Sequence, residues 1–248
     1  MKFKEYGSKD KDTILLLHGG GLSWWNYREV ASLLEQDCHI ILPILDGHAG
    51  SDHPFTTIED NALEIITFID EQCNGSILLM GGLSLGAQIL IEILSQRKDI
   101  CSYAFIESAS VLPSKFLNAF ITPSLHLSYG LIKNKSFAKL QFKSLHIKHD
   151  LFEDYYQDTC QIKKEDMIAF LKANTSYSLK NSFKDAKAKI RVYVGEKETS
   201  EMIHSAETIF KMHPSSELHR LPNLRHGEFS MNHATQYAEA IKKIIQNS

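Results

Sequence analysis

Short, continuous apolar runs alternate with amphipathic segments in the first and last parts of the chain. A continuous apolar run is typical of a strand buried in a parallel sheet, and apolar residues three or four positions apart indicate a helix. Strands are predicted at 13–17, 39–45, 77–80, 103–106, 190–195 and 217–221. Helices are predicted at 25–34, 57–69, 87–94, 200–212 and 235–245. This alternation favours an α/β fold with a mostly parallel sheet covered by helices on both faces.

The alternation stops at about residue 110 and resumes close to residue 188. The segment between them has helical periodicity, many lysines and aromatic residues, and little strand signal. We therefore predict one core domain made of residues 1–109 and 188–248. A mostly helical cap at 110–187 is expected to lie over the carboxyl edge of the sheet.

The composition is that of an ordinary globular protein of one large domain, with 248 residues, 43% hydrophobic and 23% charged. The net charge of −3 is too small to favour nucleic acid as a partner. No apolar run is long enough to span a bilayer, and the first residues lack the apolar segment of a secretion signal. We therefore expect a cytoplasmic protein without integral membrane association. The four cysteines lack metal-ligand spacing, so we expect free thiols and neither a metal nor an organic cofactor.

The chain carries a glycine–serine motif, GLSLG at 82–86, between a predicted strand and a predicted helix. A serine at such a sharp corner has a strained backbone, and the flanking glycines let the strand and the helix pack closely around it. The N-terminus of the helix directs free N–H groups and the positive end of its dipole toward the hydroxyl. Ser84 is therefore the predicted nucleophile.

A serine hydroxyl needs a general base to become a good nucleophile. His226 follows the last predicted strand, at the edge of an α/β sheet where ligands gather. We prefer it to His233, which lies close to the start of the last predicted helix.

The base in turn needs a carboxylate to orient it. Glu198 comes directly after the strand at 190–195 and is our first choice. Glu196 on the same loop and Glu107 after the strand at 103–106 are the alternatives.

The sequence HGGG at 18–21 follows the first strong strand and offers backbone N–H groups that a substrate oxygen can approach. We expect the N–H groups of Gly20 and Leu85 to form an oxyanion hole, and His18 to brace the loop. Of the two tryptophans that follow, Trp24 and Trp25, one is expected to line the pocket and the other to pack in the core. Trp25 is favoured for the protein interior.

Taken together, these motifs resemble the α/β-hydrolase superfamily. The resemblance covers nearly the whole chain outside the cap, and it includes the turn DGHAGS at 46–51 and the chain order serine, acid, histidine. It implies that Ser84 is the nucleophile, Glu198 the acid and His226 the base, and that the cap selects the substrate. The chain departs from the family pattern in using Glu for the more common Asp, and in having Ala49 where the turn usually has glycine.

The function that this resemblance implies is a serine esterase, carboxylesterase-like or lipase-like, that cleaves a small ester through an acyl-enzyme. Gly21, Trp25 and Phe120 are expected to contact the substrate. Apolar cap residues are expected either to line a pocket for an apolar acyl group or to pack the cap onto the core: Phe116, Leu117, Phe120, Ile121, Leu125, Leu127, Tyr129 and Leu131. The alternatives are a carbon–carbon bond hydrolase or a thioesterase on the same fold, and, outside the enzymes, a binding protein that keeps a hydrolase pocket.

Overall fold

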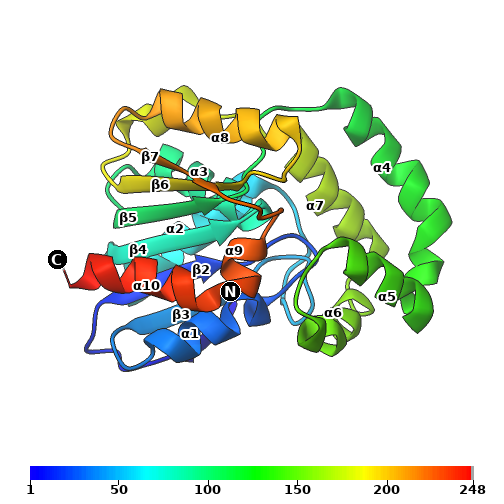
Figure 1. Ribbon diagram of the computed structural model, residues 1–248, viewed down its shortest axis with the longest axis horizontal. Coiled ribbons are helices and arrows are strands. Elements are labelled where there is room, and N and C mark those ends of the chain that lie inside the picture. The colour runs from blue at the N-terminus through cyan, green and yellow to red at the C-terminus, as the bar shows by residue number, and fades with distance from the viewer. Residues whose placement is uncertain (247–248) are drawn as a thin grey trace.

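A single seven-stranded sheet forms the centre of the molecule (Figure 1). The structure is a computed structural model that describes residues 1–246. The strands lie in the order β1-β3-β2-β4-β5-β6-β7; β1 is antiparallel to β3, and the other pairs are parallel. Their bounds are β1 Lys2–Tyr6, β2 Thr13–Leu17, β3 His39–Ile44, β4 Ile77–Leu83, β5 Cys101–Glu107, β6 Lys189–Gly195 and β7 Glu217–Leu221. The mostly parallel sheet predicted from the apolar runs is confirmed.

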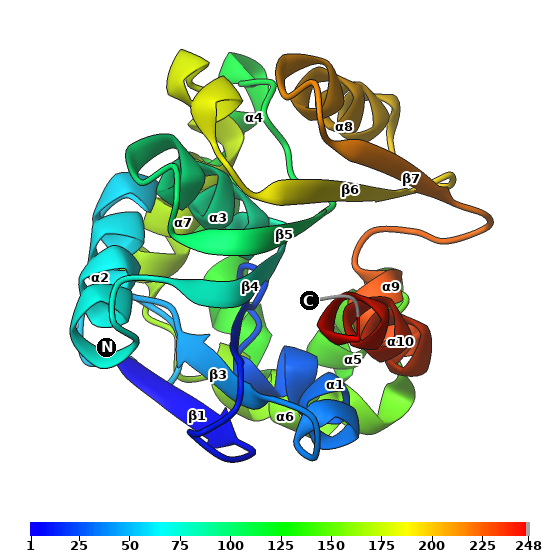
Figure 2. The same ribbon diagram turned by 90° about the vertical axis from the view of Figure 1, so that its left-hand side faces the viewer.

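Helices cover both faces of this sheet. Their bounds are α1 Arg28–Leu34, α2 Ile58–Gln72, α3 Leu85–Gln96, α4 Lys115–Ser128, α5 Lys135–Ser144, α6 Phe152–Thr159, α7 Lys164–Ser176, α8 Ser200–Met212, α9 Glu228–Asn232 and α10 Ala234–Ile245. Figure 2 shows α1 and α10 on one face, with α2, α3 and α8 on the other. Successive side chains of a strand point to opposite faces, so Ile14 and Leu16 enter one core and Leu15 and Leu17 the other. This is why the buried strands have no polar alternation.

Two elements were missed from the sequence pattern. Strand β1 lies at the edge of the sheet, where Lys2, Lys4 and Glu5 are exposed, so it lacks an apolar run. Helix α9 has only five residues, too few to show a helical period. The helix predicted at 25–34 is also divided: Trp24–Tyr27 forms a 3₁₀ turn before α1 begins.

Four α-helices, α4 to α7, lie between β5 and β6 and form the cap at one end of the molecule (Figure 1). Polar contacts attach it to the core: the indole N–H of Trp25 donates to Asp158 Oδ2 at 2.7 Å, and the backbone N–H of Phe55 donates to Asp166 Oδ1 at 2.9 Å. All four cysteines of the chain are free. Among the described residues, no helix has the length and apolar character needed to cross a membrane.

Candidate active site

Ser84 occupies a tight turn between β4 and α3. Its backbone has φ +53° and ψ −112°, a conformation that an L-residue adopts only under strain. The glycines on either side are required by packing, because a Cβ at Gly82 would lie 2.5 Å from the carbonyl oxygen of Gly86, and a Cβ at Gly86 would lie 2.2 Å from that of Leu17. The N–H of Ser84 donates to the carbonyl oxygen of Glu107 at 2.9 Å, which ties the turn to β5.

His226 and Glu198 form a hydrogen-bonded pair. The distance from His226 Nδ1 to Glu198 Oε2 is 2.9 Å. A carboxylate only accepts, so Nδ1–H donates; in the neutral ring this leaves the lone pair on Nε2. The Glu198 side chain is 1% exposed and that of His226 is 46% exposed. The imidazole is therefore accessible to substrate while its carboxylate partner is shielded from water.

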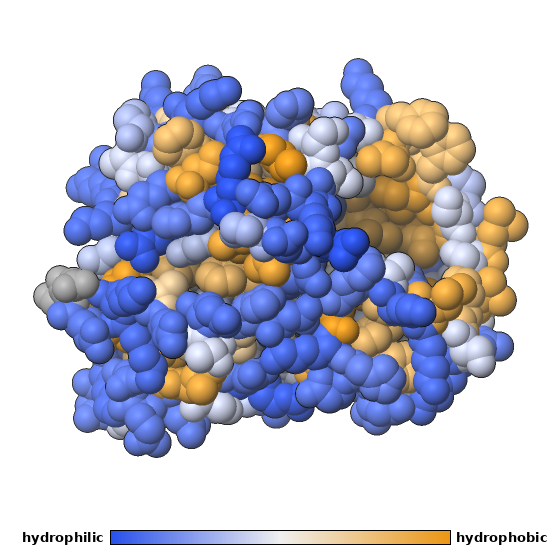
Figure 3. Space-filling view, in the orientation of Figure 1, coloured by the Kyte–Doolittle hydropathy of each residue, from blue (hydrophilic) through white to orange (hydrophobic). Residues whose placement is uncertain are grey.

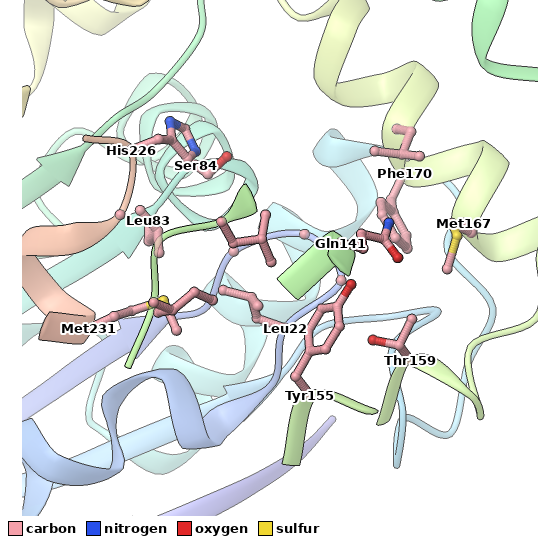
Figure 4. A pocket seen from close by; sticks show the side chains of 17 residues that line it. Leu22, Leu83, Ser84, Gln141, Tyr155, Thr159, Met167, Phe170, His226 and Met231 are labelled. Carbon is pink, nitrogen blue, oxygen red and sulfur yellow. The ribbon is translucent and has the colours of Figure 1, made fainter. Parts of the chain in front are cut away.

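Ser84 and His226 line the same pocket, as Figure 4 shows. The Ser84 hydroxyl makes no hydrogen bond with any residue in the described part of the chain. Hydrogen bonds between a nucleophile and its base are often long in unliganded enzymes and shorten when substrate binds. The fold thus brings two side chains that are far apart in the sequence to the lining of one cavity.

A further side chain that the sequence analysis missed, Ser108, holds Glu198 in place. Glu198 Oε1 accepts from the Ser108 hydroxyl and from the N–H of Gly195, both at 2.8 Å. Ser108 has a backbone φ of +54°, almost the same as Ser84. The only sequence signal for it is its position directly after a buried strand. The long glutamate side chain is thus anchored by its own loop and by the end of β5.

The other residues considered for the acid and the base lie elsewhere. Glu196 is exposed and forms no hydrogen bond or ion pair with His226. His233 lies between α9 and α10 and does not line the pocket. Glu107 is buried, and its Oε1 accepts from the backbone N–H of Ser230 at 3.2 Å. Burial raises the pKa of Glu107 to about 7.

Two buried neutral histidines brace the glycine loop. Nδ1–H of His18 donates to the Gly19 carbonyl at 2.9 Å, and His18 Nε2 accepts from the N–H of Leu45 at 3.1 Å. His48 Nε2 accepts from the N–H of Gly21 at 3.0 Å. Burial lowers the pKa of His48 to about 4 and that of His18 well below its usual value. Both rings therefore act as fixed hydrogen-bond partners at neutral pH.

This bracing leaves Gly20 free to donate. Its N–H makes no hydrogen bond with any described residue, in contrast to the N–H groups of Gly19 and Gly21. Leu85 is the first residue of α3, so its N–H has no acceptor within the helix. A Cβ at Gly20 would lie 3.5 Å from the Leu85 side chain, so the two residues are neighbours. The arrangement suits a negatively charged oxygen above Ser84.

The pocket has a volume of about 320 Å³, and its walls are mostly apolar (Figure 4). Its polar groups away from Ser84 come from the cap: Gln141, Tyr155 and Thr159. Thr159 Oγ1 is buried and has no partner among the described residues. Apolar side chains that line the pocket are Leu22, Leu83, Leu145, Ile147, Met167, Phe170, Leu171 and Met231.

Of the three residues expected to contact substrate, only Gly21 lines this pocket. Trp25 is buried, and its indole N–H donates to Asp158 of the cap, so this side chain joins the core to the cap instead. Phe120 lies on α4 with its side chain exposed, away from the pocket lining. The cap residues that do line the pocket come mainly from α5, α6 and α7. The sequence carried no signal for them because their proximity to Ser84 depends on how the cap folds back.

One group of side chains has the donors of a metal site. Ligand atoms of Asp46, His53 and Glu64 lie within 4.8 Å of one another. Glu64 is also paired with the N-terminal amine at 2.9 Å. None of the three lines the pocket, so this group has no part in the site around Ser84.

The sequence was compared with known protein families and structures. A profile of the alpha/beta hydrolase family matches residues 14–240. The chain belongs to this family. No protein among curated sequences matches it significantly.

Solved α/β-hydrolase structures share the fold at low identity. A thermophilic esterase from Thermogutta terrifontis has a TM-score of 0.80 at 16% identity, over 99% of this chain and 93% of that one. A hydrolase from Pseudomonas aeruginosa has a TM-score of 0.82 at 13% identity, over 98% and 93%. An esterase from Exiguobacterium antarcticum has a TM-score of 0.81 at 16% identity, over 98% and 94%. The likeness includes the cap, because it extends over nearly the whole of each chain.

Proposed function

We propose that this α/β-hydrolase cleaves carboxylic esters through an acyl-enzyme on Ser84. The observation that carries the proposal is the buried carboxylate of Glu198 bonded at 2.9 Å to an exposed imidazole that shares a pocket with a strained serine. In the first step His226 Nε2 takes the Ser84 proton while Oγ attacks the ester carbon. The negative charge on the carbonyl oxygen is then stabilised by the N–H groups of Gly20 and Leu85.

The same groups complete the reaction. The His226 imidazolium gives its proton to the leaving alcohol oxygen, and the alcohol departs. A water molecule then loses a proton to the same imidazole and attacks the acyl carbon. The bond from that carbon to Ser84 Oγ breaks, the carboxylic acid leaves, and the imidazolium returns the proton to Oγ. Glu198 stabilises the imidazolium in both halves and keeps the ring in the tautomer with the proton on Nδ1.

The pocket supports a short to medium acyl group as the preferred substrate. Its volume of about 320 Å³ suits a small ester, and its lining is mostly apolar. The cap, residues 110–187, supplies much of this lining and would therefore select the substrate. Two of the structural relatives reported above are named as esterases, which supports ester hydrolysis over the carbon–carbon and thioester alternatives.

A pre-steady-state experiment tests the proposal. The wild-type protein should release a burst of p-nitrophenol from a p-nitrophenyl ester and should react with a fluorophosphonate probe, since both require an activated serine. Ser84→Ala should abolish both. Ser95→Ala is the matched control, because the Ser95 hydroxyl donates to the Ile91 carbonyl on α3 and to no other described residue. Equal ester hydrolysis by Ser84→Ala and wild type would contradict the proposal.

A further inference from the structure

The outer face of α4 carries a row of exposed apolar side chains. Phe116 is 71% exposed, Phe120 54% and Leu127 85%. With Pro123 they are spaced four, three and four residues apart, which places them within a sector of about 60° on the helix surface. The rings of Phe116 and Phe120 contact each other, with centroids 4.7 Å apart. A surface helix normally directs its apolar face inward, so this row requires a partner.

The row extends onto α5, toward the active-site pocket. Leu140 on α5 is 69% exposed, and Leu145, just after it, is 39% exposed and lines the pocket. Figure 3 shows apolar surface gathered at this end of the molecule, around a hollow. These side chains therefore neither fill the acyl pocket nor pack the cap onto the core, as was expected for Phe116, Phe120 and Leu127. They add to the apolar surface at the cap end of the molecule (Figure 3), and Leu145 links this surface to the pocket.

The same segment is strongly basic. Residues 111–148 contain six lysines and no aspartate or glutamate, so the rest of the chain has a net charge of −9. Lys135 pairs with Glu153 and Lys148 with Glu29. The lysines of this segment that make no ion pair with any described residue are Lys115, Lys133, Lys139 and Lys143. The segment that carries the exposed apolar row thus also carries an excess of positive charge.

We propose that this surface, residues 111–148, docks on a lipid bilayer that contains anionic headgroups. The geometry matches a helix lying in the plane of the interface, with aromatic and leucine side chains entering the acyl boundary and lysines at headgroup level. Charge complementarity favours an anionic bilayer over a second copy of the chain, because the face carries positive charge without acidic residues to pair with it in a symmetric contact. Docking in this orientation brings the pocket next to the bilayer through Leu145.

Co-sedimentation of the full chain with vesicles tests the apolar part of the proposal. Wild type should bind vesicles of phosphatidylcholine mixed with phosphatidylserine more tightly than vesicles of phosphatidylcholine alone. The double variant Phe120→Ser, Leu127→Ser should bind the mixed vesicles at least about tenfold more weakly than wild type does. Leu63→Ser is the matched control, because Leu63 is a similarly exposed leucine on α2, outside the cap. This variant should bind the vesicles as wild type does. Thermal unfolding of each variant verifies that the fold is kept.

A charge-reversed variant tests the electrostatic part. Lys139→Glu with Lys143→Glu should lower binding to the mixed vesicles by about tenfold or more, and Lys98→Glu, at the opposite end of the sheet, should not. Binding should be the same in Ser84→Ala, which separates docking from the proposed ester hydrolysis. Wild type that fails to sediment with the mixed vesicles would refute the proposal. A second result would also refute it: ultracentrifugation shows a concentration-dependent dimer, the Phe120→Ser, Leu127→Ser variant lacks this dimer, and wild type does not bind vesicles.

Discussion

Glu107→Gln tests whether the buried carboxyl group of Glu107 is protonated in the folded protein and makes stability depend on pH. Glu107 is buried, its Oε2 has no partner among the described residues, and burial raises its pKa from 4.5 to about 7. Glutamine has the same shape as a protonated glutamate and cannot ionise. The side chain at position 107 is therefore neutral at every pH in this variant.

The size of the effect follows from the two pKa values. Between pH 4.5 and pH 7 the unfolded chain has lost the Glu107 proton while the folded chain still holds it, so the free energy of unfolding of wild type falls as pH rises. One pKa unit corresponds to about 1.4 kcal/mol. From pH 5 to pH 8 this group should lower the stability of wild type by about 2.5 kcal/mol. In Glu107→Gln this loss is absent.

Denaturant unfolding of both proteins at pH 5 and pH 8 measures the effect. The stability of Glu107→Gln relative to wild type should increase by about 2.5 kcal/mol from pH 5 to pH 8. Glu92→Gln is the contrasting control. Its buried carboxylate is bonded to Lys180 at 2.6 Å and to Gln96 at 2.8 Å, so the substitution should destabilise the protein at pH 8. A stability difference between Glu107→Gln and wild type that is the same at both pH values would refute the reasoning.

Three further predictions concern the site. Ser108→Ala removes one of the three hydrogen bonds to Glu198, so kcat for a p-nitrophenyl ester should fall about tenfold with KM unchanged; an unchanged kcat would exclude a positioning role. Glu198→Gln should lower kcat/KM about a thousandfold or more, while Glu196→Gln should stay within about twofold, and the reverse result would reassign the acid. Gly86→Ala places a methyl group 2.2 Å from the Leu17 carbonyl oxygen and should reduce the unfolding free energy by about 3 kcal/mol or more, which a wild-type denaturation midpoint would contradict.

The fold and the corner at Ser84 could be predicted from the sequence because both depend on local patterns. The buried strands β2 and β4 are unbroken apolar runs, and the serine lies between two glycines that the close packing of β4 on α3 requires. His226 and Glu198 were chosen because each lies on a loop that follows a strand, and the carboxyl ends of parallel strands meet at one edge. The edge strand β1 was missed because its exposed residues Lys2, Lys4 and Glu5 leave no apolar run.

The tertiary structure alone decided which groups surround these residues. Ser108 contacts Glu198 across 90 residues of sequence, and Tyr155 and Thr159 reach the pocket only because the cap folds over the sheet. Helix α4 shows most directly why the sequence pattern could not decide these contacts. Its sequence is apolar on two sides, and periodicity cannot tell which side packs inward, because burial depends on the helices that it meets. Only the packing of α4 on α7 leaves the row of Phe116 and Leu127 facing outward.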